Sequence, residues 1–229
     1  MYSITLGDGG GVSIIDRDGT MWLLKATLRS LHVVLAAVVL QVYYETLSPS
    51  IAGGDSGEIV AEGCILGTAH PPGYPLLTML IYGIKHLDQF LPWATSVAYR
   101  VNAFSAVCTV LAGVFIALIV KNLSATVIRG AKLSTHEYAG GGHLISAGLF
   151  AFSPLIWQYA VTAEVFPLNT LFSALILYLV TAFAARRQVW VAVVGAFVCG
   201  LALCNQHTIV LFEVRCELRA AFMRRAHAH

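Results

Sequence analysis

Residues 101–120 read VNAFSAVCTVLAGVFIALIV, an apolar run without Lys, Arg, Asp or Glu. A helix needs about 20 such residues to cross the hydrocarbon core of a bilayer, so this run predicts a membrane span. Further apolar runs lie on both sides of it, and those after it also lack the four charged residue types. The sequence therefore predicts an all-α integral membrane protein with about five spans, at residues 31–47, 101–120, 144–161, 165–185 and 189–212.

The composition agrees with this class of protein. Of 229 residues, 58% are hydrophobic and 11% are charged, against about 25% charged residues in an ordinary soluble domain. The net charge is +2 and no basic stripe is present, so no nucleic-acid partner is expected. The cysteines form no CxxC pair and no metal-type spacing with histidine, which predicts packing cysteines and no metal site.

Charges outside the runs predict the orientation. Arg17, Lys25 and Arg29 precede the first run, which places the N-terminus in the cytoplasm. The polar, glycine-rich beginning lacks the pattern of a cleavable signal peptide, and residues 1–27 are predicted to be a disordered cytoplasmic tail.

Residues 74–91 are apolar enough to enter the membrane, yet they contain Lys85, His86 and Asp88. If this segment crossed, the later loops would violate the positive-inside rule. We therefore predict a lumenal interfacial helix that lies on or dips into the membrane. The membrane domain is then expected at residues 28–212, with the first lumenal loop at 48–96.

The end of the chain does not fit this topology. The fifth span should leave the membrane on the lumenal side, but residues 213–229 form a basic tail with four arginines. We expect an aberrant or truncated end; a re-entrant fifth segment is the alternative.

Two motifs in the first lumenal loop contain candidate chemical groups. The glycine-rich stretch GGDSGE at 53–58 presents Asp55 and Glu58, which suit acid/base work or a cation but also fit a solvated turn before a helix. The proline-rich stretch HPPGYP at 70–75 is stiff. It either presents His70 and Tyr74 to a ligand or is only a rigid entry to the following helix.

Further candidates lie at the ends of the predicted spans. Arg100 can hold a lipid phosphate by paired hydrogen bonds or act as an interfacial anchor. Glu164 has almost no polar loop around it, and an ionisable residue at such a depth indicates function. Asn205, Gln206 and His207 are three consecutive polar residues within the last run. The topology gathers the acidic loop, Glu164 and this polar triplet toward one face of the membrane.

Five motifs in this order resemble the transmembrane protein 260 family and its bacterial relatives, long labelled a domain of unknown function. The resemblance covers about residues 31–211 and rests on GGDSGE (53–58), AHPPGYP (69–75), AYRVN (98–102), AEVFPLN (163–169) and GLALCNQHT (200–208). It implies a type C glycosyltransferase fold with a lumenal active site in the endoplasmic reticulum membrane. The implied reaction transfers mannose from dolichyl phosphate mannose to Ser or Thr hydroxyls of extracellular protein domains, with no cofactor.

The resemblance also implies roles for the candidate residues. Asp55 would be the general base that deprotonates the acceptor hydroxyl, with inversion at the anomeric carbon. Arg100 and His207 would receive the charge of the leaving phosphate. The remaining candidates would orient Asp55 or the sugar, or donate hydrogen bonds: Glu58, His70, Tyr74, Glu164, Asn205 and Gln206.

Two other functions compete with the enzyme. A transporter or channel is suggested by Glu164, His207 and the prolines within the spans, although no inverted repeat is apparent. A non-catalytic membrane scaffold would use the GGDSGE loop to bind a partner. A scaffold should tolerate Asp55→Asn, because it needs no base.

Overall fold

The computed structural model describes residues 3–6, 12–15, 17–87, 96–130 and 141–213. Helices make up most of these residues. The elements are β1 (Ser3–Leu6), β2 (Val12–Ile15), α1 (Arg17–Glu45), α2 (Ser56–Ile65), α3 (Pro75–Lys85), α4 (Val97–Gly130), α5 (Gly142–Ala151), α6 (Pro154–Ala160), α7 (Val165–Arg186), α8 (Val189–Asn205) and the 3-10 turn η1 (His207–Ile209).

The first elements lie where the sequence predicts a disordered tail. Strands β1 and β2 pair antiparallel, with Ile4 opposite Ile14, and α1 begins at Arg17. Both strands, SITL and VSII, consist of aliphatic and hydroxyl residues, several of which favour strands.

Two helices in the described part of the chain are long and apolar enough to cross a membrane: Val97–Val127 within α4 and Val165–Ala185 within α7. The remaining apolar helices are shorter, namely Leu31–Glu45, Pro75–Lys85, Gly142–Ala151 and Val189–Asn205. The helical class is thus confirmed, while the five-span count and the type C glycosyltransferase fold stay predictions.

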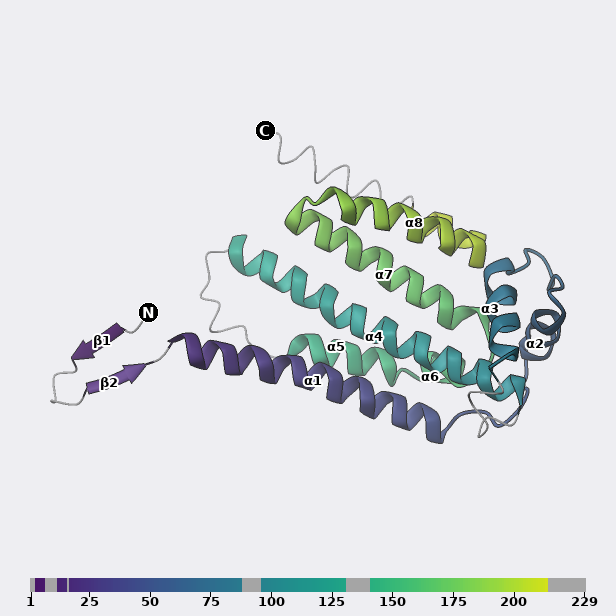
Figure 1. Cartoon of the computed structure of the whole chain (residues 1–229), viewed down its shortest axis with the longest axis horizontal. Helices are drawn as coiled ribbons and strands as arrows, with labels where there is room; N and C mark the ends of the chain where they lie inside the picture. The colour runs from purple at the N-terminus through teal and green to yellow at the C-terminus, as the bar shows by residue number, and fades with distance from the viewer. Residues whose placement is uncertain (1–2, 7–11, 16, 88–95, 131–140, 214–229) are drawn as a thin grey trace.

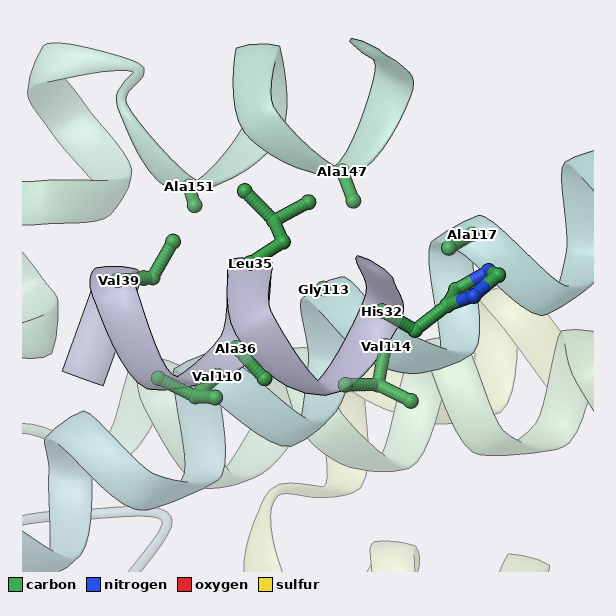
Figure 2. Close-up of a pocket in the computed structure, with 10 residues that line it drawn as sticks. All are labelled: His32, Leu35, Ala36, Val39, Val110, Gly113, Val114, Ala117, Ala147 and Ala151. Atoms are coloured by element: carbon green, nitrogen blue, oxygen red, sulfur yellow. The ribbon is translucent and has the colours of Figure 1, made fainter. Parts of the chain in front are cut away.

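Helix α4 is the centre of the bundle. It packs against α7, α5 and α1, and α8 packs on the far side of α7 (Figure 1). Small side chains permit close approach between apolar helices. Figure 2 shows this between α1, α4 and α5, where Leu35 points toward α5 between Ala147 and Ala151 and the alanines leave a small apolar pocket.

Prolines and polar residues divide two of the predicted spans. Pro154 within the apolar run 144–161 predicts a kinked but continuous helix, because neighbouring helices can satisfy the freed carbonyls. In the structure α5 ends at Ala151 and α6 begins at Pro154, so the run is broken instead. The break follows because proline clashes with the preceding turn and lacks an N–H donor. Pro167 instead lies in the first turn of α7, where N–H groups have no partner within the helix, and α7 continues to Arg186.

The run 189–212 is also interrupted. Helix α8 ends at Asn205, Gln206 is extended with φ −151° and ψ 114°, and η1 follows. The predicted fifth span is therefore not one continuous helix over this range. The predicted basic tail at 213–229 lies outside the described residues except for Glu213.

Helices α2 and α3 lie together at one end of the bundle, near the end of α1 and the start of α4 (Figure 1). Leu77 and Ile81 of α3 are buried, whereas Met79 and Tyr82 are exposed, so α3 packs one face against the bundle and leaves apolar side chains on its other face. Gly63 of α2 faces α3 so closely that a Cβ there would lie 2.5 Å from Ile81 Cγ2.

This contact leads to a stability prediction. Gly63→Ala should lower the free energy of unfolding by about 1–3 kcal/mol, because the added methyl forces α2 away from Ile81. Gly83→Ala in α3 is the matched control, since a Cβ there meets nothing within 4 Å. It should leave stability unchanged or raise it by about 0.5–1 kcal/mol. Thermal unfolding in detergent measures both variants, and equal effects would contradict the close α2–α3 contact.

Candidate functional site

The loop that leads into GGDSGE is fixed by a buried asparagine of α4. The Asn102 side-chain amide donates to the carbonyls of Ser48 (2.8 Å) and Ser50 (3.0 Å). The Ser48 N–H donates to the carbonyl of Val161 at 3.1 Å, which ties the same loop to the end of α6. These bonds connect α1, α4 and α6 at one end of the bundle, so the glycine loop starts from a defined place.

Asp55 lies at the start of α2 but does not use its side chain as a cap. Its carbonyl accepts a hydrogen bond from the Ile59 N–H at 2.9 Å, while its carboxylate caps no N–H of the helix. The side chain is 55% exposed. A carboxylate that is positioned by its backbone and open to solvent is suited to accept a proton.

Glu164 approaches the same residue from the start of α7. The Glu164 carboxylate faces the backbone N–H of Asp55, which favours the charged form of Glu164. Gly54 permits this approach, because its φ of +73° is left-handed and a Cβ there would lie 3.0 Å from Glu164 Oε1. Burial, together with the charge of Asp55, raises the pKa of Glu164, which is 8% exposed.

His70 joins the two carboxylates of α2. Its Nδ1 lies 2.9 Å from Glu58 Oε2, and its Nε2 lies 3.7 Å from Asp55 Oδ2. The hydrogen bond with Glu58 raises the pKa of His70, and the bonds from His70 lower the pKa of Glu58. The imidazole of His70 thus lies between Glu58 and Asp55, and both carboxylates favour its protonated form.

Tyr74 completes this group on the side of α3. Its hydroxyl lies 3.2 Å from His70 Nε2, and its ring meets the imidazole edge-on with centroids 5.5 Å apart. Burial and then the nearby carboxylates raise the pKa of Tyr74. The phenol thus stays neutral and can donate a hydrogen bond. The sequence-predicted residues Asp55, Glu58, His70, Tyr74 and Glu164 are brought together.

A cavity opens beside Asp55 and Glu164, between the glycine loop and the turn from α6 to α7. Its volume is about 540 Å³, which falls in the usual range of small-molecule sites. One wall is formed by Tyr159 and Phe166, whose ring centroids are 4.6 Å apart. The lining residues are Ala52, Gly53, Gly54, Asp55, Gln158, Tyr159, Thr162, Glu164 and Phe166.

The other sequence-predicted residues do not line this cavity. The Arg100 side chain is buried, and Nη2 donates to the carbonyl of Lys85 at 3.2 Å, where the cation suits the C-terminal end of α3. Asn205 is buried at the end of α8, Gln206 follows it, and His207 is exposed in η1. This end of α8 packs against α3, so the polar triplet lies at the same end of the bundle as the cavity.

Sequence reasoning missed two groups. The first is Asn102, which holds the loop; its position inside an apolar run was the available signal. The wall residues Gln158, Tyr159, Thr162 and Phe166 flank Glu164 in the sequence, and only the turn between α6 and α7 brings them around one space. The described residues show no group of three His, Cys, Asp or Glu placed to hold a metal ion.

Comparison with known proteins gives a consistent result. Residues 55–227 match the model of the family described as Protein O-mannosyl-transferase TMEM260 N-terminal domain. The chain is similar to Protein O-mannosyl-transferase TMEM260 of Mus musculus, with 45% identity over 90% of this chain and 27% of the relative. It is also similar to Protein O-mannosyl-transferase tmem260 of Dictyostelium discoideum, with 34% identity over 86% of this chain and 24% of the relative.

The chain therefore spans about a quarter of the length of these relatives. No solved structure matches it.

Proposed function

This chain belongs to the TMEM260 family of protein O-mannosyl-transferases, and we propose that its cavity beside Asp55 is where mannose is transferred from dolichyl phosphate mannose to Ser or Thr hydroxyls of proteins. The observation that carries the proposal is the Asp55 carboxylate. Its backbone N–H faces Glu164, its side chain has no capping role, and it lies at the edge of a cavity. Membership of this family favours a transferase over a transporter or a scaffold.

The proposed setting is the lumenal face of the endoplasmic reticulum membrane, with membrane lipid around about five spans and the N-terminus in the cytoplasm. The arrangement of the helices supports this topology. The end of α1, helices α2 and α3, the start of α7 and the end of α8 all lie at one end of the bundle (Figure 1). Positively charged residues flank the apolar helices toward the other end, as the positive-inside rule requires of a cytoplasmic side.

The proposed chemistry needs one base and no acid. The acceptor oxygen bonds to the anomeric carbon as its proton passes to the Asp55 carboxylate. The bond between that carbon and the phosphate oxygen breaks, and its electron pair leaves with dolichyl phosphate. A phosphate leaves without being protonated, and attack from the opposite face inverts the configuration. No metal or other cofactor enters this scheme.

The neighbouring groups have positioning roles in the proposal. Glu164 holds the backbone of Asp55, and His70 connects Asp55 to Glu58 and Tyr74. Of the cations proposed for the leaving phosphate, His207 is exposed at the same end of the bundle. Arg100 contacts the end of α3 and would have to leave the Lys85 carbonyl to serve.

A transfer assay tests the proposal. Microsomes that contain the chain receive radiolabelled dolichyl phosphate mannose and a candidate extracellular protein domain, and label on Ser or Thr is measured. Transfer that depends on both substrates supports the proposal. The absence of transfer from any lipid-linked sugar, with the chain well expressed and membrane-inserted, would contradict it.

His70 gives the reaction an expected pH dependence. Protonated His70 has an N–H on both ring nitrogens, so that Nδ1 serves Glu58 while Nε2 faces Asp55 and Tyr74. Glu58 raises the pKa of His70 above its usual value of about 6.5. Above the raised pKa the Nε2 proton is lost and Asp55 loses this support. Initial rates of transfer should therefore decline as the pH rises through the pKa of His70.

His70→Gln is the control for this assignment, because an amide keeps the same hydrogen-bonding groups at every pH. The variant should be slower below the transition and should lack the decline. The other titratable groups that face His70 are Asp55, Glu58, Tyr74 and Glu164. A decline that is unchanged in His70→Gln would belong to one of them and would contradict the role given to His70.

A further inference from the structure

The carboxyl groups that line the cavity beside Asp55 favour the sugar of a lipid-linked donor over its phosphate. Its lining residues include the carboxyl groups of Asp55 and Glu164 and contain no Lys or Arg. A phosphate placed there would be repelled by Asp55, and it would lack the cationic partners that phosphate sites provide. The ligand of this cavity must therefore be uncharged or must donate hydrogen bonds.

The remaining lining groups fit a polyhydroxylated ring. Sugar hydroxyls donate to carboxylates, and the Gln158 amide and the Thr162 hydroxyl can both donate and accept. Tyr159 and Phe166 form an aromatic wall at 4.6 Å between centroids, and the apolar C–H face of a hexose covers such a ring. Carboxylates on one side and aromatic rings on the other match the two kinds of surface that a hexose presents.

We propose that this cavity binds the hexose ring of the lipid-linked donor and excludes its phosphate, with Tyr159 as the stacking residue and Gln158 as a hydrogen-bonding residue of the sugar. The inference rests on the proposed function and goes beyond it by separating the places of sugar and phosphate. The sugar then lies directly beside the Asp55 carboxylate. The phosphate and the polyprenyl chain lie outside the cavity, where the two carboxyl groups do not oppose them.

Binding of two radiolabelled lipids to the full chain in detergent micelles tests this inference. The probes are dolichyl phosphate mannose and dolichyl phosphate, which differ by the sugar alone. Tyr159→Ala should weaken binding of the mannosylated lipid about tenfold, since a lost stacking partner is worth about one such factor. It should leave the affinity for dolichyl phosphate unchanged.

Two further variants keep the test independent of folding. Gln158 is exposed, so Gln158→Ala removes the amide without disturbing a packed side chain. This variant should lower the affinity for dolichyl phosphate mannose a few-fold and leave the affinity for dolichyl phosphate unchanged. Tyr159→Phe keeps the ring and should bind nearly as wild type. Trp190→Ala, an exposed aromatic residue at the start of α8, is the matched control and should change neither affinity.

The outcomes separate the two levels of the proposal. Tyr159→Ala and Gln158→Ala could lower the affinity for both lipids equally, or could change neither affinity. Either result would contradict sugar binding in this cavity but not the proposed transferase activity. If the wild-type chain binds dolichyl phosphate mannose no better than dolichyl phosphate, the chain recognises no sugar and the inference is wrong. If it binds neither lipid, the proposed donor is wrong as well.

Discussion

Asp55→Asn should lower the rate of mannose transfer about a hundred- to ten-thousand-fold, the usual contribution of general-base catalysis. The amide has the shape of the carboxylate but cannot accept the proton of the acceptor hydroxyl. The backbone N–H that binds Glu164 is unchanged, so the loop should keep its geometry. Single-turnover transfer in microsomes, at equal expression and with donor binding measured in parallel, gives the result.

Glu62→Gln is the matched control for this experiment. Glu62 belongs to the same helix, α2, but does not line the cavity. The control should transfer at the wild-type rate. Transfer by Asp55→Asn that equals the control would show that another group accepts the proton, and the mechanism proposed for this cavity would fail.

Gly54→Ala should have the second largest effect, with transfer reduced about a hundredfold. Two costs coincide at this position. A side chain is strained at φ +73°, and the new Cβ would lie 3.0 Å from Glu164 Oε1, so either the loop or Glu164 must move. Either movement alters the contact between the Glu164 carboxylate and the backbone of Asp55. The loss of stability should be only about 1 kcal/mol, because the glycine loop is exposed.

Gly53→Ala provides the neighbouring control. Gly53 has no positive φ, and a Cβ there meets nothing within 4 Å. The two variants differ by one position in the same loop, and the transfer rate and the thermal unfolding of both are measured together. Gly54→Ala with the activity of Gly53→Ala would show that the contact between Glu164 and Asp55 does not matter for the reaction.

The sequence could predict that Asp55 and Glu164 lie close together, because the membrane topology determines it. When the first loop and the turn before Val165 lie on the same side of the membrane, Asp55 and Glu164 must come from the same end of the bundle. His70 and Tyr74 belong to the same predicted loop, 48–96, as GGDSGE, so they lie at this end of the bundle too. In these cases the order of helices and short-range stiffness were enough, and side-chain packing did not need to be known.

Other features depend on packing that the sequence pattern does not contain. Asn102 bonds the carbonyls of Ser48 and Ser50 because α4 is rotated to face the end of α1. Arg100, two residues earlier, faces the end of α3. An apolar run predicts that a helix forms, but it does not predict how that helix is rotated against its neighbours. The sequence alone therefore could not show which group Arg100 faces.

The break at Pro154 has a similar cause. A proline within a membrane helix can kink it or end it, depending on whether neighbouring groups satisfy the freed carbonyls. Here α5 ends before Pro154 and α6 is a separate helix, whose Tyr159 lies against Phe166. The aromatic wall of the cavity therefore depends on a feature that the sequence predicted with the wrong degree of bending.

Photocrosslinking tests most directly whether the cavity beside Asp55 binds the donor sugar. A radiolabelled dolichyl phosphate mannose analogue with a photoreactive group on the sugar is bound to the full chain, irradiated, and mapped by peptide sequencing, with excess unlabelled donor as competitor. Competed label should appear in the peptides that contain residues 52–55 and 158–166. Competed label confined to other segments would contradict this site.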